Sequence, residues 1–389
     1  MGKYSVIFSF LCMCNFIIAQ KDKVYTDLDD ALKNPLNVYK LDLSYSKLKK
    51  LPDAVSLLTN LEELNIAQNR LTTLPESMGK LVKLTYLHAS NNNITKLPES
   101  IGKLIKLHTL NLSHNQLSIL PNTICGLKSL KELDISINKI AAFPENIGLL
   151  TNLFWIEASN NRLSTLPITM ASLPKLEGLS ISINRFVVFP SVVTSIKGLK
   201  TLNLGRNKIT IIPALIGEMK NITRLDLQEN GIKELSKDIS KLNTLLYLNL
   251  SYNPLVKLDD SFAQLTSLKE LEMTFLEMPV FPEVITRLFE LEILNLGYNK
   301  ISVLPDNISN LVNLKEAYLN DNLIIKLPNT LVELTNLARL DVQSNKIKII
   351  QDDIWTMPSL KYINIDGNKG MKLTPEQRKI LKKKSEEVF

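Results

Sequence analysis

An asparagine recurs every 23 residues along most of this chain of 389 residues. It occupies positions 69, 92, 115, 138, 161, 184, 207, 230, 253, 299, 322, 345 and 368, and only Ser46 and Leu276 interrupt the column. The fifteen units follow one another without insertion or deletion. Because a fixed period of this kind stacks one structural unit on the next, the sequence predicts a single repeat array, although the length alone favours two or three domains.

Apolar residues keep the same register as the asparagine. They lie five and three positions before it, as Leu64 and Ile66 do before Asn69, and two and five positions after it, as Leu71 and Leu74 do. Alternate side chains of an extended segment face opposite ways, so each unit is expected to add one short strand to a parallel sheet. A proline follows the last apolar position in seven consecutive units, at 75, 98, 121, 144, 167, 190 and 213.

This pattern resembles the leucine-rich repeat in its 23-residue Ras-suppressor and plant intracellular form, LxxLxLxxNxLxxLPxxIxxL, over about residues 36–373. The resemblance implies an α/β solenoid: a leucine-rich-repeat horseshoe with a parallel concave β-sheet of about 15 strands and helical caps. The column asparagine is expected to be structural, because its amide both donates and accepts hydrogen bonds among the turns.

Both ends of the array are expected to carry capping helices. In residues 20–35, Thr26 and Asp29 are spaced as a capping box, and Asn34 and Pro35 end the helix. In residues 374–389, the sequence that begins at Thr374 with Pro375 next to it is typical of a helix start.

The N-terminus predicts a signal peptide over residues 1–19. A start with Lys3 precedes an apolar stretch over residues 6–18, and Ala19 comes before Gln20 and a charged segment. The stretch is shorter than the roughly 20 residues that a membrane-spanning helix needs. We therefore expect cleavage after Ala19, export to the periplasm, the cell surface or the medium, and no membrane span in the mature chain.

Cysteine usage agrees with that interpretation. Two of the three cysteines, Cys12 and Cys14, lie in the predicted signal, so Cys125 is left without an intramolecular partner. Extracellular animal members of the resembling family usually have cysteine-paired caps, which makes a bacterial exported protein the expected class. A lipidated Cys12 or Cys14 remains an alternative, although Leu11 and Met13 stand where a small residue is expected.

The motifs of common enzymes are not found, and we predict no catalytic activity and no cofactor. His88, His108 and His114 fall in adjacent units and are expected on the concave side, but no cysteine or close carboxylate completes a metal site there. The formal charge of +7 is spread along the chain with mixed signs, which argues against nucleic-acid binding.

Outward positions of the strands are free to carry recognition. The candidate ligand-binding residues are those with large or charged side chains there: Tyr86, His88, Phe154, Trp155, Arg206, Arg224, Tyr247, Tyr252, Phe275, Tyr298 and Tyr318. Tyr252, Phe275 and Tyr298 occupy one position in three successive units and should form an aromatic ladder, either as a hot spot or simply as stabilising stacking. In the same region Leu276 replaces the column asparagine, through drift or for a special role.

These observations predict an exported, monomeric, non-catalytic module that binds a protein or peptide on its concave face. A cell-surface adhesion protein that recognises glycans through residues such as Trp155 is an alternative. If residues 1–19 are not a signal, the resemblance implies a cytosolic scaffold for a small GTPase.

Overall fold

A computed structural model describes residues 21–386 of the chain. The predicted signal peptide, residues 1–19, and the last three residues lie outside the described residues. The chain divides into two compact units, Met1–Arg185 and Phe186–Phe389, each of which is treated by itself below. Within residues 21–386, none of the helices is both long enough and apolar enough to cross a membrane.

Each repeat contributes one strand of three residues, and the two-residue strand β1 precedes the first repeat. Within each compact unit, successive strands pair in parallel in sequence order. The strands of unit 1 are β1 Val24–Tyr25, β2 Lys40–Asp42, β3 Glu63–Asn65, β4 Tyr86–His88, β5 Thr109–Asn111, β6 Glu132–Asp134, β7 Trp155–Glu157 and β8 Gly178–Ser180. Those of unit 2 are β9 Thr201–Asn203, β10 Arg224–Asp226, β11 Tyr247–Asn249, β12 Glu270–Glu272, β13 Ile293–Asn295, β14 Glu316–Tyr318, β15 Arg339–Asp341 and β16 Tyr362–Asn364.

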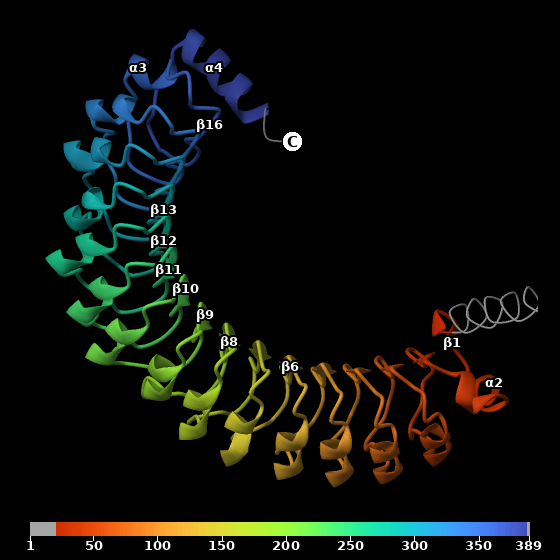
Figure 1. The fold of residues 1–389 in the computed structure, drawn as a ribbon. Helices are drawn as coiled ribbons and strands as arrows, with labels where there is room; N and C mark the ends of the chain where they lie inside the picture. Colours follow the sequence, from red (N-terminus) through yellow and green to blue (C-terminus); the bar gives the residue numbers. More distant parts are fainter. Residues whose placement is uncertain (1–20, 387–389) are drawn as a thin grey trace, which may run out of the picture. The chain divides into compact units, whose positions relative to one another are not determined.

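Short 3₁₀ helices lie opposite the strands in each unit (Figure 1). In unit 1 they are η1 Pro35–Asn37, η2 Asp53–Leu57, η3 Glu76–Lys80, η4 Glu99–Lys103, η5 Asn122–Gly126, η6 Glu145–Leu149 and η7 Ile168–Ser172. In unit 2 they are η8 Ser191–Ser195, η9 Ala214–Glu218, η10 Lys237–Lys241, η11 Asp260–Gln264, η12 Glu283–Arg287, η13 Asp306–Asn310 and η14 Asn329–Glu333. The recurring proline directly precedes most of these helices, because its fixed φ suits the extended residue before them.

The core lies between the strands and the helices. In β3 the central Leu64 is fully buried, while Glu63 and Asn65 on either side face outward. The register places Leu64 beside Leu87 of the next strand, so residues at equal positions of successive repeats are neighbours. The predicted solenoid of parallel strands is therefore confirmed, with β1 as a further strand that the repeat pattern did not include.

The column asparagines form a buried ladder. The side chain of Asn92 donates from Nδ2 to the carbonyl oxygens of Ile66, Ala89 and Ser90 at 2.9, 3.2 and 3.2 Å, and its Oδ1 accepts from the N–H of Leu71 at 2.9 Å. One side chain thus satisfies backbone groups of its own repeat and of the preceding repeat. The structural role expected for this residue is seen throughout the column, as at Asn345.

The two exceptions to the column change the backbone locally. At Ser46 and at Leu276 the following residue, Lys47 or Glu277, takes a left-handed conformation with φ of 57° or 58°. At Leu276, Asn299 Oδ1 of the next repeat accepts from the N–H of Met278 at 3.1 Å, as in the regular ladder, and also from the N–H of Leu276 at 3.2 Å. The irregularity therefore alters one turn and leaves the flanking strands paired.

The N-terminal cap differs in detail from the prediction. Helix α2, Leu28–Leu32, begins after Asp27, whose carboxylate accepts from the N–H of Asp30 at 2.8 Å. The predicted capping box of Thr26 and Asp29 is therefore wrong. Its spacing fits the motif, but Asp27 stands nearer to the free N–H groups of the first turn and caps them instead.

The C-terminal cap begins as predicted. Helix α4, Pro375–Glu386, starts with a capping box in which Gln377 N–H donates to Thr374 Oγ1 at 3.2 Å and Thr374 N–H donates to Gln377 Oε1 at 3.0 Å. Gln377 also donates to Asp352 at 2.8 Å, in the short helix α3, Asp352–Trp355. The helix α4 thereby packs against α3 and β16 and covers the open end of the sheet.

The asparagine ladder makes a stability prediction. Asn92→Ala leaves several buried backbone groups without partners, so the free energy of unfolding should fall by about 2–4 kcal/mol. The exposed neighbour Asn93→Ala is the matched control and should stay within about 0.5 kcal/mol of the parent chain. Urea unfolding followed by circular dichroism measures both. If Asn92→Ala and Asn93→Ala unfold with the same free energy, the asparagine ladder does not stabilise the fold as proposed.

Candidate ligand-binding surface

In each repeat, the residue before the column position turns the chain away from the strand, including the residues before Ser46 and Leu276. We call this set of residues the turn column. Its non-glycine members all have φ between 50° and 57°: Tyr45, Gln68, Asn91, His114, Ile137, Asn160 and Ile183 in unit 1, and Arg206, Glu229, Tyr252, Phe275, Tyr298, Asp321 and Ser344 in unit 2. A left-handed conformation costs an L-residue roughly 1–2 kcal/mol, which glycine avoids. The repeat dictates the turn, but it does not dictate aromatic or β-branched side chains there.

Three of these turns carry the predicted aromatic ladder, Tyr252, Phe275 and Tyr298. The ring centroids of Tyr252 and Phe275 are 4.2 Å apart with planes 13° apart, and those of Phe275 and Tyr298 are 4.1 Å and 9° apart. The three side chains remain 46%, 38% and 44% exposed. Both faces of Phe275 are covered by its neighbours, so this middle ring presents its edge to a ligand and the two tyrosines add phenol groups.

An open hollow of ≈ 760 Å³ lies beside the aromatic ladder. Its lining combines two rings of the ladder with apolar and charged side chains: Arg206, Gln228, Glu229, Tyr252, Asn253, Pro254, Val256, Phe275, Leu276 and Glu277. Arg206 Nε is paired with Glu229 Oε2 at 2.7 Å, in line with the ladder along the turn column. Leu276, which replaces the column asparagine, gives the floor of this hollow an apolar residue where the regular repeat has an amide.

The strands beside the ladder hold two more of the predicted residues. The guanidinium of Arg224 lies 3.3 Å from the ring centroid of Tyr247 in the next strand, and Tyr247 is only 9% exposed. Burial, followed by the negative charge of Asp226, raises the pKa of Tyr247 to about 12. Arg224 thus lies exposed over the ring in a cation–π contact, while burial and Asp226 keep the phenol of Tyr247 protonated against the opposing charge of Arg224.

Tyr318 belongs to the same unit but not to the ladder. It is half-buried on β14, and its hydroxyl donates to Glu316 Oε2 at 2.5 Å. Burial, and then the hydrogen bond to Glu316, raises its pKa to about 12. The phenol is thus engaged within its own strand.

Two carboxylates in the middle of this surface are not among the predicted residues. Glu270 and Glu272 are the outward residues of β12, the strand that precedes Phe275. Burial raises the pKa of Glu272 to about 7, although the side chain of Asn295 donates a hydrogen bond to it. The sequence signal for them is glutamate at both outward positions of one predicted strand.

The candidates in unit 1 are not gathered in one place. Tyr86 and His88 lie on β4, with ring centroids 6.1 Å apart in an edge-to-face arrangement, and His88 Nε2 is 2.8 Å from Ser90 Oγ. Phe154 and Trp155 come three repeats later, at the start of β7. The indole of Trp155 lies against Gly178, where an added methyl group would meet ring carbons at 1.9–2.0 Å.

The histidines take different settings. Burial lowers the pKa of His88, whereas His108 and His114 are exposed. Within the described part of the chain, no group of three histidine, cysteine or acidic residues is arranged to hold a metal ion.

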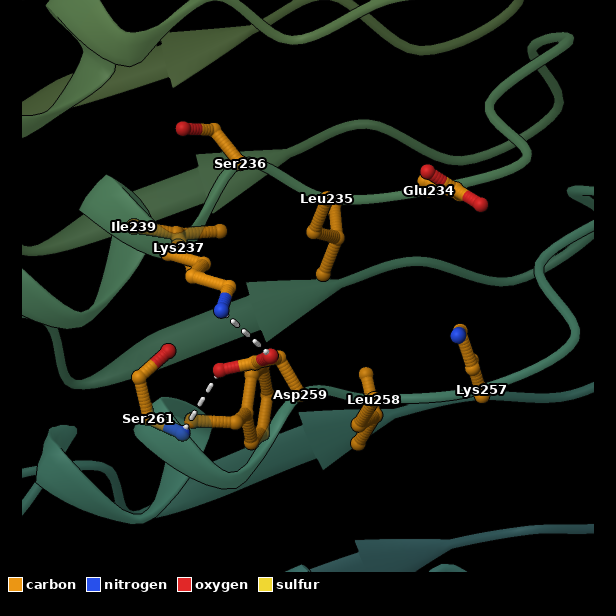
Figure 2. A pocket seen from close by; sticks show the side chains of 10 residues that line it. Glu234, Leu235, Ser236, Lys237, Ile239, Lys257, Leu258, Asp259 and Ser261 are labelled. Carbon is orange, nitrogen blue, oxygen red and sulfur yellow. Dashed lines mark hydrogen bonds and ion pairs between the residues drawn. The ribbon is translucent and has the colours of Figure 1, made fainter.

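A second hollow, of ≈ 290 Å³, lies at the start of η10 and η11 (Figure 2). It coincides with the two successive units in which Ser236 and Asp259 replace the recurring proline. Asp259 accepts from the N–H of Ser261 at 3.0 Å and pairs with Lys237 at 3.3 Å, and Ser236 caps η10. These polar groups stabilise their own helices, so the ladder surface is the stronger candidate.

Family models match most of the repeat region. A model described as leucine-rich repeat region matches residues 77–185, one described as leucine rich repeat matches residues 37–94 and 220–275, and a further leucine rich repeat model matches residues 198–219 and 290–311. No curated protein matches the sequence significantly.

Solved structures of similar fold include a leucine-rich-repeat protein of Leptospira interrogans, with 31% identity, a TM-score of 0.86, and coverage of 93% of this chain and 98% of that one. The ectodomain of the Arabidopsis thaliana receptor kinase GASSHO1/SCHENGEN3, in complex with Casparian strip integrity factor 2, is 24% identical with a TM-score of 0.55, covering 90% of this chain and 50% of that one. Toll of Drosophila, in complex with Spätzle, is 23% identical with a TM-score of 0.72, covering 82% and 46%.

The half-buried carboxyl group of Glu272 predicts a pH-dependent stability. Its folded pKa of about 7 lies above the ordinary value of 4.5, so the folded state binds more protons than the unfolded chain between these pH values. The contribution of this group to stability is therefore lost as the pH rises through about 7. Glu272→Gln should leave the unfolding free energy nearly unchanged at pH 4.5 and increase it at pH 8. Urea unfolding at both pH values measures this, and a variant that is less stable at pH 8 would contradict it.

Proposed function

Because the chain belongs to the leucine-rich-repeat family, and such repeats typically serve as non-catalytic protein-interaction modules, we propose that it binds an extended peptide or protein segment on the strand face of unit 2. The observation that carries this proposal is the aromatic ladder. Tyr252, Phe275 and Tyr298 are large, partly exposed and set on turns whose backbone conformation disfavours them. Tyrosine and arginine are enriched among the residues that dominate binding energy.

Support also comes from the surroundings of the ladder. The hollow beside it offers apolar contact through Val256 and Leu276, and charged groups at Arg206 and Glu277 give specificity. The plant and fly structures named above have folds similar to that of this chain, and each was solved in complex with a partner. Strain that is held at a binding surface is a recurring feature of functional sites.

Glycan recognition is the less favoured alternative. Both faces of Phe275 are covered, so this ring presents its edge, which carries the positive part of the ring quadrupole and suits carbonyl oxygens or other rings met edge-on. Trp155, a large aromatic residue on a strand of unit 1, is packed against Gly178.

Peptide selection tests the proposal. The full chain, immobilised, is used to select binders from a displayed library of random peptides, and the affinity of each binder is measured by isothermal titration. Phe275→Ala should weaken binding about 30-fold or more, as expected for a hot-spot residue. Ile137→Ala, at the same left-handed position in unit 1, is the matched control and should leave binding unchanged.

Two outcomes contradict peptide binding at the ladder. Either no peptide is enriched over the bare surface, or the selected peptides bind Phe275→Ala as well as the parent chain. A glycan-array signal that is lost on Trp155→Ala would favour the alternative.

We also propose that the protein is exported. The support is the signal-like sequence of residues 1–19 and the single cysteine, Cys125, in the chain that follows. Cell fractionation with N-terminal sequencing should find a chain that starts at Gln20 outside the cytoplasm. A chain that starts at Met1 or Gly2 in the cytosol would contradict export and favour an intracellular scaffold.

A further inference from the structure

The strand face of unit 2 is acidic although the whole chain is basic. The outward strand positions and the turn column of this unit hold seven carboxylates, namely Asp226, Glu229, Glu270, Glu272, Glu316, Asp321 and Asp341, and three arginines, Arg206, Arg224 and Arg339. The chain carries a formal charge of +7. A ligand that docks on this face therefore meets a charge opposite to that of the protein as a whole.

The three arginines of the face are already engaged. Arg206 is paired with Glu229 at 2.7 Å, and Arg224 and Arg339 lie over the rings of Tyr247 and Tyr362 at 3.3 and 4.2 Å. Three lysines beside the face, Lys269, Lys300 and Lys315, have acidic partners of their own. Glu292 is held between Lys269 and Lys315 at 2.7 and 2.6 Å, and Lys300 pairs with Glu277 at 3.1 Å.

The carboxylates of β12 lack such a partner. Tyr247 and Ile293 flank Glu270 in register, and Asn249 and Asn295 flank Glu272. Within residues 21–386, neither glutamate takes part in an ion pair of 4.0 Å or less. Burial works against the charge of Glu272, as its raised pKa shows, with Glu270 and Asp226 adding repulsion and Arg224 opposing it. A cation supplied from outside would relieve this cost.

The same three repeats carry the aromatic ladder. Ser251, Thr274 and Gly297 connect β11, β12 and β13 to Tyr252, Phe275 and Tyr298. This row of small residues separates the β12 carboxylates from the rings. Along these repeats the β12 carboxylates therefore come first, the small residues next and the rings last.

We propose that the peptide ligand places an arginine or lysine side chain against Glu270 and Glu272 while its apolar residues contact the aromatic ladder. This inference rests on the proposed peptide-binding function and adds the chemistry of the ligand. An ammonium or guanidinium group forms charge-assisted hydrogen bonds to carboxylates, and arginine can bind one carboxylate through two parallel bonds. Glu272 accepts such a partner in its ionised form, so ligand binding releases a proton near neutral pH.

The test compares selected peptides with their charge-neutral analogues. Peptides chosen on the full chain should share a basic residue at one position. Its replacement by glutamine should weaken binding to the parent chain about tenfold or more. The double variant Glu270→Gln/Glu272→Gln should lose affinity for the original peptide by a similar factor and bind the glutamine analogue as the parent chain does. Such non-additivity shows that the two changes remove one interaction.

Controls separate this contact from general electrostatics. Glu316→Gln removes one carboxylate from the same face, two strands away, and should leave the affinity unchanged. For the parent chain the affinity should fall from pH 8 to pH 6, because Glu272 takes up a proton, and it should stay constant for the double variant. Circular dichroism at both pH values confirms that each variant is folded.

The outcomes distinguish the two proposals. Peptides that depend on Phe275 but lack a shared basic residue, or that bind the double variant unchanged, overturn this inference and leave the proposed function standing. Absence of any peptide that depends on Phe275 overturns both. A third outcome would assign the carboxylates to a metal ion and also overturn the inference. In that outcome, millimolar Ca²⁺ competes with the peptide and binding requires Glu270 and Glu272, but the peptide needs no basic residue.

Discussion

The buried asparagine is the interaction on which each unit of this structure depends. Its amide ties carbonyl groups of its own repeat to those of the preceding repeat and accepts an N–H in return, as at Asn299 and Asn322. Since these backbone groups are buried, leaving them unpaired is costly. The ladder therefore holds the repeat at 23 residues and aligns side chains at equal positions of neighbouring turns. The stacking of Tyr252, Phe275 and Tyr298 is a consequence of that alignment.

The proposed binding surface lies where this constraint is interrupted. Phe275 is the middle ring of the aromatic ladder, yet it precedes Leu276, the one position in unit 2 without an asparagine. Asn299 of the following repeat supplies an oxygen to the altered turn, and the neighbouring rings cover both faces of Phe275. The turn thus keeps its left-handed conformation although its own amide is absent. The apolar Leu276 becomes part of the adjoining hollow.

The charge state of the same surface depends on how deeply its carboxylates are buried as much as on how many ionisable groups it holds. Arg224 covers Tyr247 instead of meeting the carboxylates, because a guanidinium stacks well on a ring and loses little hydration there. Glu272 is consequently desolvated beside uncharged amides, and its pKa rises to about 7. An array with a modest positive charge overall can in this way present an acidic, pH-sensitive strip beside an aromatic one.

The sequence alone determined the repeat length, the parallel strands, the C-terminal cap and the aromatic ladder, because a 23-residue period with alternating apolar positions leaves few other ways to bury the leucines. Asp27 as the N-cap of α2, β1 as an added strand, and the left-handed Glu277 depend on local competition for hydrogen bonds, which spacing does not reveal. The burial of Tyr247 under Arg224 and the lack of a counter-ion for Glu272 were decided only in the tertiary structure. Both features depend on contacts between side chains that are 23 residues apart in sequence. These side chains become neighbours, and adopt their rotamers, only when the repeats are stacked.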